Sequence, residues 1–419
     1  AEEVYSYYQN ALLSKNQVDF ADMINEAEKI LTEIEQYKEK PKYKYIIIDE
    51  FQDIAKQRFN LTKRLADVTG AHVVAVGDDW QSIFAFAGSD ITLFQRFLEL
   101  MGDGIPLFIT HTYRNSQELI DIAGGFIQKN SSQIPKHLKS PKKIKDPVAV
   151  ECYDDKKEIR KNWIDKIVEV VGKIVDEYGP ESSILLIGRY NFDRDMLVKS
   201  GKFTEITKER VKCEKHPKTD ITFLTVHTSK GLGFDNVIVL NMIEGRYGFP
   251  SQIEDDPIMK LVTHSDSTIQ FAEERRLLYV AMTRTKNKVY LIAPISRPSR
   301  FVIELVDDYK IPHHKDMNKD IQLKKYMPCP VCGLPLKYEN NKNYGLPLYM
   351  CTNEPELCDF MTNDKILPRD IYKCPKCHDG FMIVKKRKND DNRFYGCTNF
   401  NSNPKCTNST TIVIQHEKK

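Results

Sequence analysis

Short apolar runs alternate along this chain with longer amphipathic stretches. The runs at residues 45–48 (YIII) and 71–76 (AHVVAV) lack the strict alternation of a half-buried strand, so we expect strands covered on both faces, as in a parallel sheet. Residues 57–68 between them repeat apolar positions at helical spacing. Strand, helix and strand in this order predict a βαβ unit.

The first 40 residues have the spacing of helices. Their apolar residues recur every three or four positions, and we expect these side chains to face a core. They are Val4, Tyr7, Tyr8, Leu12, Phe20, Met23, Ile24, Ala27, Ile30, Leu31 and Ile34.

A second series of alternating elements begins with a helix expected at 116–128. Ser116 is its expected N-cap, because a serine hydroxyl accepts a hydrogen bond from the first turn. The other expected elements are strands at 148–152, 183–188 and 288–292, helices at 159–178 and 273–285, and two strands flanking a polar turn within 221–240. The pattern predicts an α/β fold with two parallel-sheet domains.

The composition is that of a globular protein, with 41% hydrophobic and 29% charged residues. The net charge of +3 is nearly neutral, so a nucleic-acid partner would have to meet local basic patches. No apolar run is long enough to span a membrane, and no secretion signal is evident. We therefore expect a cytoplasmic protein without a membrane partner.

Two acids, Asp49 and Glu50, follow the strand expected at 45–48. Ligands of open α/β sheets bind outside the carboxyl ends of the strands. Asp49 can therefore hold Mg²⁺ beside a phosphate, and Glu50 can orient or deprotonate a water molecule. A solvated acidic turn is the alternative, and these two residues alone do not decide between them.

The segment 77–90 mixes polar and aromatic residues after the second strand. Gln81 can sense a phosphate, and Phe84 and Phe86 can stack on bases. Phenylalanines in isolation are more often part of a core. The pair Tyr113 and Arg114, further along, is weak evidence by itself.

The polar turn within 221–240 carries His227, Ser229, Lys230 and Gly231. A glycine after the lysine lets backbone N–H groups approach an anion. Arg284 ends the helix expected at 273–285, where it can stabilise charge in phosphoryl transfer or simply cap the helix dipole.

Five segments in this order resemble the motifs of superfamily 1 helicases of the UvrD/Rep group. DEFQD (49–53) resembles motif II, GDDWQSIFAFAG (77–88) motif III, TYRN (112–115) motif IV, TVHTSKGLGF (225–234) motif V and EERRLLYVAMTRT (273–285) motif VI. Trp80 after GDD is similar to the helicase IV type of this group. The resemblance implies two RecA-like motor domains that use ATP and Mg²⁺.

The resemblance also implies roles for single residues. Asp49 would bind Mg²⁺, Glu50 would activate water, and Tyr113 would stack on adenine. The γ-phosphate would be contacted by Gln81, Arg114 and Arg284, and the single-stranded DNA by Phe84, Phe86, Thr225 and His227.

This sequence departs from the family pattern in four ways. It contains no GxxxxGK[ST] phosphate-binding loop, so we expect an incomplete first motor domain, a longer parent protein and little activity of the chain alone. Gly233 replaces a glutamate that contacts the nucleotide sugar, and Ala87 replaces a common arginine. The span between motifs IV and V has no room for a large extra subdomain.

Eight of the ten cysteines lie after residue 328 and form two copies of one spacing pattern. Each copy offers four thiolates for a tetrahedral Zn²⁺, and a redox role for the CPxC pairs is the weaker alternative. The expected ligands are Cys329, Cys332, Cys351 and Cys358 in the first copy, and Cys374, Cys377, Cys397 and Cys406 in the second.

Both copies are similar to the zinc ribbons of bacterial type IA topoisomerases, which bind single-stranded DNA and in some cases protein partners. Basic and aromatic residues between the half-sites suit backbone contact and base stacking. We expect DNA contacts from Lys385, Lys386, Arg387, Phe394 and Tyr395. A solvated hairpin with aromatic packing against the zinc site is the alternative.

The expected domains are 1–110 and 111–310 for the two motor domains, and 326–364 and 371–412 for the two ribbons. The leading hypothesis is the C-terminal portion of an ATP-dependent DNA helicase, moving 3′ to 5′ on single-stranded DNA or at junctions with duplex, in repair, recombination or defence. The alternative is a non-catalytic DNA-binding or regulatory protein.

Overall fold

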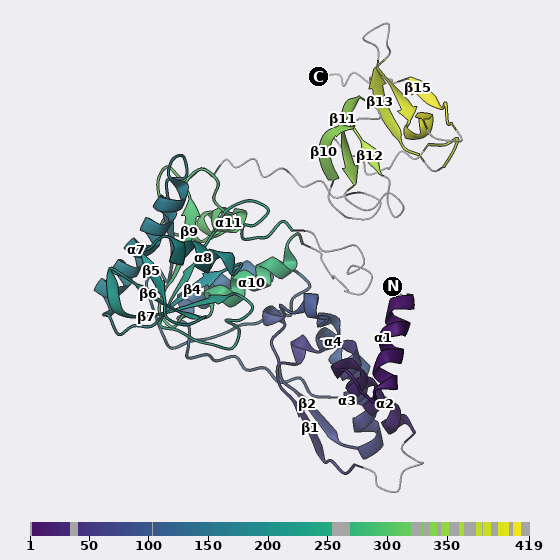
Figure 1. Ribbon diagram of the computed structural model, residues 1–419, viewed down its shortest axis with the longest axis horizontal. Coiled ribbons are helices and arrows are strands. Elements are labelled where there is room, and N and C mark those ends of the chain that lie inside the picture. The colour runs from purple at the N-terminus through teal and green to yellow at the C-terminus, as the bar shows by residue number, and fades with distance from the viewer. Residues whose placement is uncertain are drawn as a thin grey trace. The chain divides into compact units, whose positions relative to one another are not determined.

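The structure is a computed structural model of the 419-residue chain, and it divides into two compact units at Ile321 and Gln322 (Figure 1). It describes residues 2–33, 41–102, 104–253, 269–319, 329, 336–341, 345–351, 360–363, 374–378, 380–386, 393–401 and 405–411. No helix among these residues is long and apolar enough to cross a membrane.

A seven-stranded sheet dominates the first unit. Its strand order is β3-β9-β8-β4-β7-β6-β5. The first five strands in this order are parallel to one another, and β6 and β5 add an antiparallel edge beside β7. The strands are β3 (Val148–Tyr153), β9 (Val289–Pro294), β8 (Asn236–Val239), β4 (Ile184–Gly188), β7 (His216–Thr225), β6 (Arg210–Cys213) and β5 (Phe203–Glu205). The mixed α/β fold class and the expected strands are confirmed.

Helices cover both faces of this sheet. Leu185, Ile187 and Val237 pack with buried residues of α6, α10 and α11, whereas Ile184 and Leu186 on the opposite face pack with α7. Because both faces are covered, every residue of β4, β8 and β9 is buried. The helices are α6 (Gln117–Gln128), α7 (Ile159–Tyr178), α8 (Phe192–Lys199), α10 (Ala272–Met282) and α11 (Arg300–Tyr309).

The limits of two helices follow from local chemistry. The Ser116 hydroxyl accepts a hydrogen bond from the Leu119 N–H at 3.4 Å, which confirms the expected N-cap of α6. The helix α7 has the bounds that its periodicity predicts, and it ends where Gly179 takes a positive φ of 84°.

The strand-pair region contains β1 (Tyr45–Ile48) and β2 (His72–Ala75), which are parallel and joined by α3 (Lys56–Thr69). This confirms the βαβ unit. The prediction that both faces are covered is wrong within the described residues, because Ile47 and Val74 are exposed. Only the other face packs against a cluster, which includes residues of α3, α4 (Ile91–Gln95) and α5 (Phe97–Met101).

The first 33 residues form two helices, α1 (Glu2–Ser14) and α2 (Phe20–Thr32). The break falls at Asp19, whose side chain caps α2 by accepting from the Asp22 N–H at 2.8 Å. The expected core-facing pattern is wrong: of the predicted side chains that are described, Leu31 alone is buried. Helical spacing gives the apolar face, but in the described residues little packs over it.

The described residues of the second unit form two antiparallel three-stranded sheets, and the rings of Phe360 and Phe381 contact each other between them at a centroid distance of 5.0 Å. The first sheet is β10 (Leu336–Asn341), β11 (Leu346–Cys351) and β12 (Met361–Thr362). The second sheet is β13 (Met382–Lys386), β14 (Arg393–Cys397) and β15 (Ser409–Thr411).

Candidate functional site

The acids after β1 lie near the turn after β2, because the two strands are parallel and both segments follow their carboxyl ends. Asp49 and Glu50 are exposed, and Glu50 adopts a left-handed conformation (φ 50°) that is unusual for a residue other than glycine. Buried Gln52 donates to the Glu50 carboxylate at 2.5 Å and accepts from the Asp78 N–H at 2.9 Å. The Gln52 amide therefore fixes the Glu50 side chain against the Asp78 turn.

Gln81 and Arg284 come together from distant parts of the sequence. The Arg284 guanidinium donates to the Gln81 side-chain oxygen at 3.1 Å and to the Val280 carbonyl at 3.0 Å. Arg284 therefore caps the end of α10, as the structural interpretation predicts, and its role in phosphoryl transfer stays a prediction. Burial, and then the nearby charge of Arg114, lower the pKa of Arg284 to about 10, so it stays charged at neutral pH.

Arg114 and Tyr113 lie on the surface of this region. A Cβ atom added at Gly233 would lie 3.6 Å from Arg114 Nε, so a larger side chain at position 233 would touch the guanidinium. Tyr113 is exposed, and its stacking on adenine stays a prediction.

Lys230 is a site residue that the sequence analysis noted in the polar turn but to which it gave no role. Its ammonium forms an ion pair with Asp53, lies 3.4 Å from Glu50, and donates to the Gln81 carbonyl at 2.8 Å. Burial raises the pKa of Asp53, and the hydrogen bond and charge of Lys230 oppose that rise. The adjacent Gly231 has a φ of 83°, which explains a glycine there.

The side chains Phe84, Phe86 and His227 form an aromatic trio beside Lys230. The His227 ring lies 6.1 Å from the Phe84 ring and 5.0 Å from the Phe86 ring, and the Lys230 ammonium lies 5.3 Å from the Phe84 ring. Phe86 is 56% exposed, whereas Phe84 packs partly against the core. Burial, and then the charge of Arg189, lower the pKa of His227 to about 4.

Thr225, the other residue expected on the DNA track, is engaged within its own turn. Its hydroxyl lies 3.0 Å from the Thr228 hydroxyl. Thr225 ends β7, two residues before His227, so both side chains belong to the same strand end.

Trp80 anchors the segment between the strand-pair region and the seven-stranded sheet. It is buried in the core of the sheet, its N–H donates to the Ile134 carbonyl at 3.0 Å, and Tyr279 meets its ring edge-on at 5.4 Å. Lys136 pairs with Asp78 and Asp79 beside it. The sequence identified Trp80 only as a family marker. In the structure, its burial and its hydrogen bond hold the backbone next to Gln81 in place.

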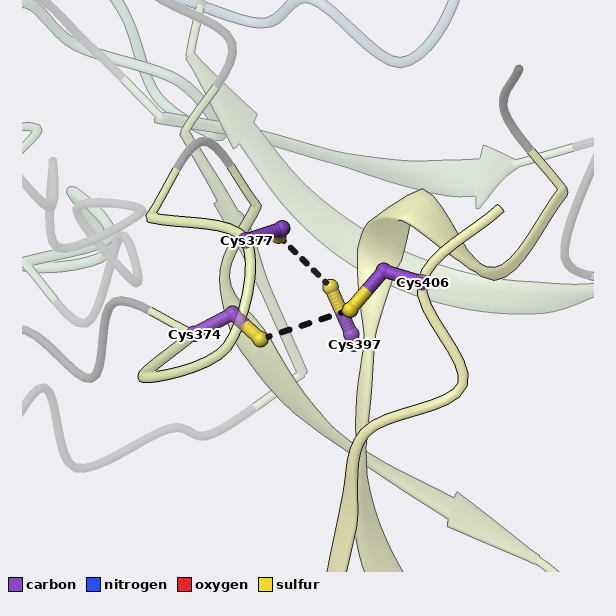
Figure 2. A group of neighbouring side chains, drawn as sticks. All are labelled: Cys374, Cys377, Cys397 and Cys406. Atoms are coloured by element: carbon purple, nitrogen blue, oxygen red, sulfur yellow. Dashed lines mark hydrogen bonds between the residues drawn. The ribbon is translucent and has the colours of Figure 1, made fainter. Parts of the chain in front are cut away.

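Four cysteines of the second unit form a candidate metal centre (Figure 2). All sulfur atoms of Cys374, Cys377, Cys397 and Cys406 lie within 4.8 Å of one another. The Cys374–Cys406 and Cys377–Cys397 sulfur distances are 3.7 and 3.6 Å. Tetrahedral zinc with Zn–S bonds of about 2.3 Å requires sulfur separations of about 3.8 Å, so the four thiols fit Zn²⁺.

The surroundings of this centre shift the pKa values of its thiols in opposite directions, because burial and the neighbouring thiols raise the pKa of Cys397. The Gly380 N–H donates to the Cys377 sulfur and the Asn399 N–H to the Cys397 sulfur, both at 3.4 Å. Burial raises the pKa of Cys374, but backbone N–H groups and the neighbouring thiols outweigh it and lower that pKa to about 6. A thiol that ionises near neutral pH is ready to bind a metal.

The first expected zinc site is described only in part. Cys329 and Cys351 belong to an apolar cluster with Leu336 and Phe360. Cys332 and Cys358 lie outside the described residues, so four ligands at this site stay a prediction.

Basic and aromatic side chains lie together on the second sheet. The Lys385 and Lys405 ammonium groups lie 5.2 and 4.1 Å from the ring of Phe400, which is half-exposed. Lys385 was expected here, whereas Phe400 and Lys405 were missed because they follow the third cysteine of the repeat. Tyr395 packs beside the cysteine cluster, as the structural alternative predicts.

The other DNA-contact predictions on this sheet have different outcomes. Phe394 is half-buried on β14. The side chain of Lys386 and the whole of Arg387 lie outside the described residues. Their contacts with DNA stay predictions.

Comparisons with known proteins agree with this arrangement. The UvrD/REP helicase N-terminal domain family matches residues 1–101, and the UvrD-like helicase C-terminal domain family matches residues 191–295. The first match contains Asp49, Glu50 and Gln81, and the second contains Lys230 and Arg284. The contacts between these side chains therefore join the two matched domains, and the chain belongs to the UvrD/REP helicases.

Relatives within this class are DNA helicases. DNA helicase IV of Escherichia coli is 32% identical over 306 residues, which are 73% of this chain and 41% of that protein. A probable DNA helicase of Mycoplasma pneumoniae is 27% identical over 348 residues, 80% of this chain and 61% of that protein. The ATP-dependent DNA helicase PcrA of Bacillus subtilis is 31% identical over 138 residues, 32% of this chain and 18% of that protein. The chain spans less than two thirds of each relative.

Proposed function

We propose that this chain is part of an ATP-dependent DNA helicase or translocase that acts on single-stranded DNA. The contacts of Lys230 carry the proposal, because one ammonium group touches the acids of the expected nucleotide site and the aromatic trio of the expected DNA track. A side chain shared in this way would connect the two binding sites physically.

The nucleotide half of the site would use ATP with Mg²⁺. Asp49 would hold the metal, Glu50 would orient water, and the Gly231 turn would lie close to phosphate. The three γ-phosphate contacts proposed are Gln81, Arg114 and Arg284. The Gln81–Arg284 hydrogen bond supports a shared task, and an arginine in this role contributes roughly 10³ to 10⁵ in phosphoryl-transfer rate.

The DNA half would use the exposed ring of Phe86 with Phe84, His227 and Thr225. Aromatic rings bind single-stranded DNA with little sequence preference, because every base offers a π-face. On the second unit, Lys385, Lys405 and Phe400 would add a smaller contact surface. We further propose 3′ to 5′ movement, action at junctions with duplex in repair, recombination or defence, and a protein partner for the zinc ribbons.

The competing proposal is a non-catalytic DNA-binding or regulatory protein. The retained Asp49, Glu50, Gln81, Arg114 and Arg284 favour the helicase. Since the 419 residues contain no GxxxxGK[ST] loop, we expect weak ATP hydrolysis by the purified chain. Strong DNA-stimulated phosphate release by this chain would contradict that expectation.

The test of the DNA site is the affinity of the purified chain for fluorescein-labelled oligothymidylate, measured by anisotropy. We expect Phe86→Ala to weaken binding by about 1 to 3 kcal/mol, the value of one stacked base. Tyr7→Ala is the matched control, because Tyr7 is an exposed aromatic residue on α1. Equal affinity of Phe86→Ala and the unmodified chain would refute the proposed track.

A further inference from the structure

Three aromatic side chains without a role in the site above lie together beyond the carboxyl ends of two central strands, β4 and β8. Tyr190 and Phe192 follow β4, and Tyr247 lies in the loop after β8. The Tyr190 and Phe192 rings stack at 5.1 Å with an interplanar angle of 12°, and Tyr247 meets them edge-on at 5.9 and 6.0 Å. These three side chains are the second ring cluster.

The cluster has one anchored ring and two exposed rings. The Tyr190 hydroxyl lies 2.7 Å from the Ser251 hydroxyl, which fixes the inner ring. Phe192 is 40% exposed and Tyr247 is 54% exposed. Rigid rings that leave so much aromatic surface in water favour a ligand with flat apolar faces.

Two arginines lie beside the rings of the cluster. The Arg246 guanidinium lies 5.6 Å from the Tyr247 ring and is exposed, and the Arg189 guanidinium lies 5.1 Å from the Tyr190 ring. Arg189 is held by the Glu274 carboxylate at 2.6 and 3.1 Å, so it positions Tyr190 rather than reaching outward. Arg246 is therefore the cation of the cluster that can meet a polyanion.

Three acids of the described residues near these strand ends are already engaged. Glu274 pairs with Arg189, and Glu244 forms an ion pair with Arg300. Asp193 is buried and accepts a hydrogen bond from the Tyr190 N–H at 3.2 Å. A polyanionic ligand would consequently meet little opposing charge from these three carboxylates.

The cluster lies beside the aromatic trio. In the parallel sheet β4 pairs with β7 on one side and with β8 on the other, so the carboxyl ends of the three strands lie at the same end of the sheet. His227 follows β7, and the charge of Arg189 after β4 contributes to the lowered pKa of His227. Neighbouring strands lie about 4.8 Å apart, so the second ring cluster after β4 and the aromatic trio at β7 are neighbours at this end of the sheet.

We propose that Phe192 and Tyr247 extend the single-stranded DNA site, with their exposed rings stacking on bases beyond those at the aromatic trio. The inference rests on the proposed function and names a further binding surface for it. Stacking needs the ring faces, and Arg246 supplies attraction for the phosphates of the same strand.

The test measures the affinity of the purified 419-residue chain for a length series of fluorescein-labelled oligothymidylates. The double variant Phe192→Ala/Tyr247→Ala is expected to lose roughly 5-fold to 150-fold in affinity per stacked base on long oligonucleotides. Short oligonucleotides that fill only the aromatic trio are expected to bind unchanged. Tyr247→Phe keeps the ring and is expected to bind every length like the unmodified chain.

Controls separate this inference from the proposed function. If Phe86→Ala weakens binding while the double variant matches the unmodified chain at every length, the extension is refuted and the proposed track stands. If neither variant changes the affinity, both are refuted. An equal loss at all lengths with a lowered unfolding temperature would indicate a structural role and overturn the inference.

An independent readout is photocrosslinking with an oligonucleotide that carries 5-iododeoxyuridine. Crosslinked peptides containing Phe192 or Tyr247 are expected. Crosslinks confined to peptides outside the second ring cluster would overturn the inference. This is the result expected if the cluster binds a protein instead of DNA.

Discussion

The seven-stranded sheet and the cysteine-rich sheets of the second unit are stabilised in different ways. The large sheet buries apolar side chains on both faces, and α7 alone contributes seven buried residues. Among its described residues, the second unit has only small apolar clusters around its cysteines. Short segments of this kind bury too little surface to fold without a metal. Losing one contact should therefore weaken the large sheet, whereas losing one ligand should unfold a small one.

The largest expected effect comes from removing the metal. We expect two zinc ions per chain by elemental analysis, and we expect Cys374→Ser to lose about one. Structural zinc contributes about 10 kcal/mol or more to folding, so the sheet β13-β14-β15 should become sensitive to protease while the seven-stranded sheet stays protected.

Cys213→Ala is the matched control for this change. Cys213 is a buried thiol of β6 in the large sheet, and its substitution should leave the zinc content unchanged. Zinc below one equivalent in the unmodified chain would refute the zinc assignment.

A smaller effect is expected from the apolar anchor at Trp80. Trp80→Ala should cost about 3 to 5 kcal/mol in urea unfolding without changing the zinc content, because it opens a cavity in the core. Trp80→Phe should cost about 1 kcal/mol more than Trp163→Phe, since the Trp80 N–H has a partner and the buried Trp163 N–H has none in the described structure. Equal costs at the two positions would contradict the role of the Ile134 hydrogen bond.

The smallest expected effect is the pH dependence at His227. Its folded-state pKa of about 4 lies below the usual value of about 6.5, so the unfolded chain takes up a proton first as the pH falls. Stability is then full above pH 6.5 and is lost between pH 6.5 and 4, by on the order of 2 kcal/mol because the ring is only partly buried. His227→Phe should flatten this part of the stability profile, and an unchanged slope would contradict the assignment.

Patterns within single segments predicted much of the fold. The apolar runs gave β1 and β4, and periodicity gave the bounds of α7. Periodicity failed for α1 and α2, because burial depends on what packs over a helix and not on the helix itself. The same limit explains why the strands β1 and β2 are exposed on one face.

The candidate site shows a similar division. Motif order placed Gln81 and Arg284 together, and the structure adds the hydrogen bond. The pairing of Lys230 with Asp53 joins residues 177 positions apart, and local spacing contains no information on it. The lysine's place in a polar turn after β7 was the available signal.

The contact between Phe360 and Phe381 would affect how the second unit binds the proposed DNA. Two sheets joined by a ring contact keep a set spacing, unlike modules on a free tether. When one sheet holds a ligand, the other is presented to the next stretch of it at a high effective concentration, provided that the spacing matches. Two weak surfaces joined in this way would act as one binder with a preferred ligand length.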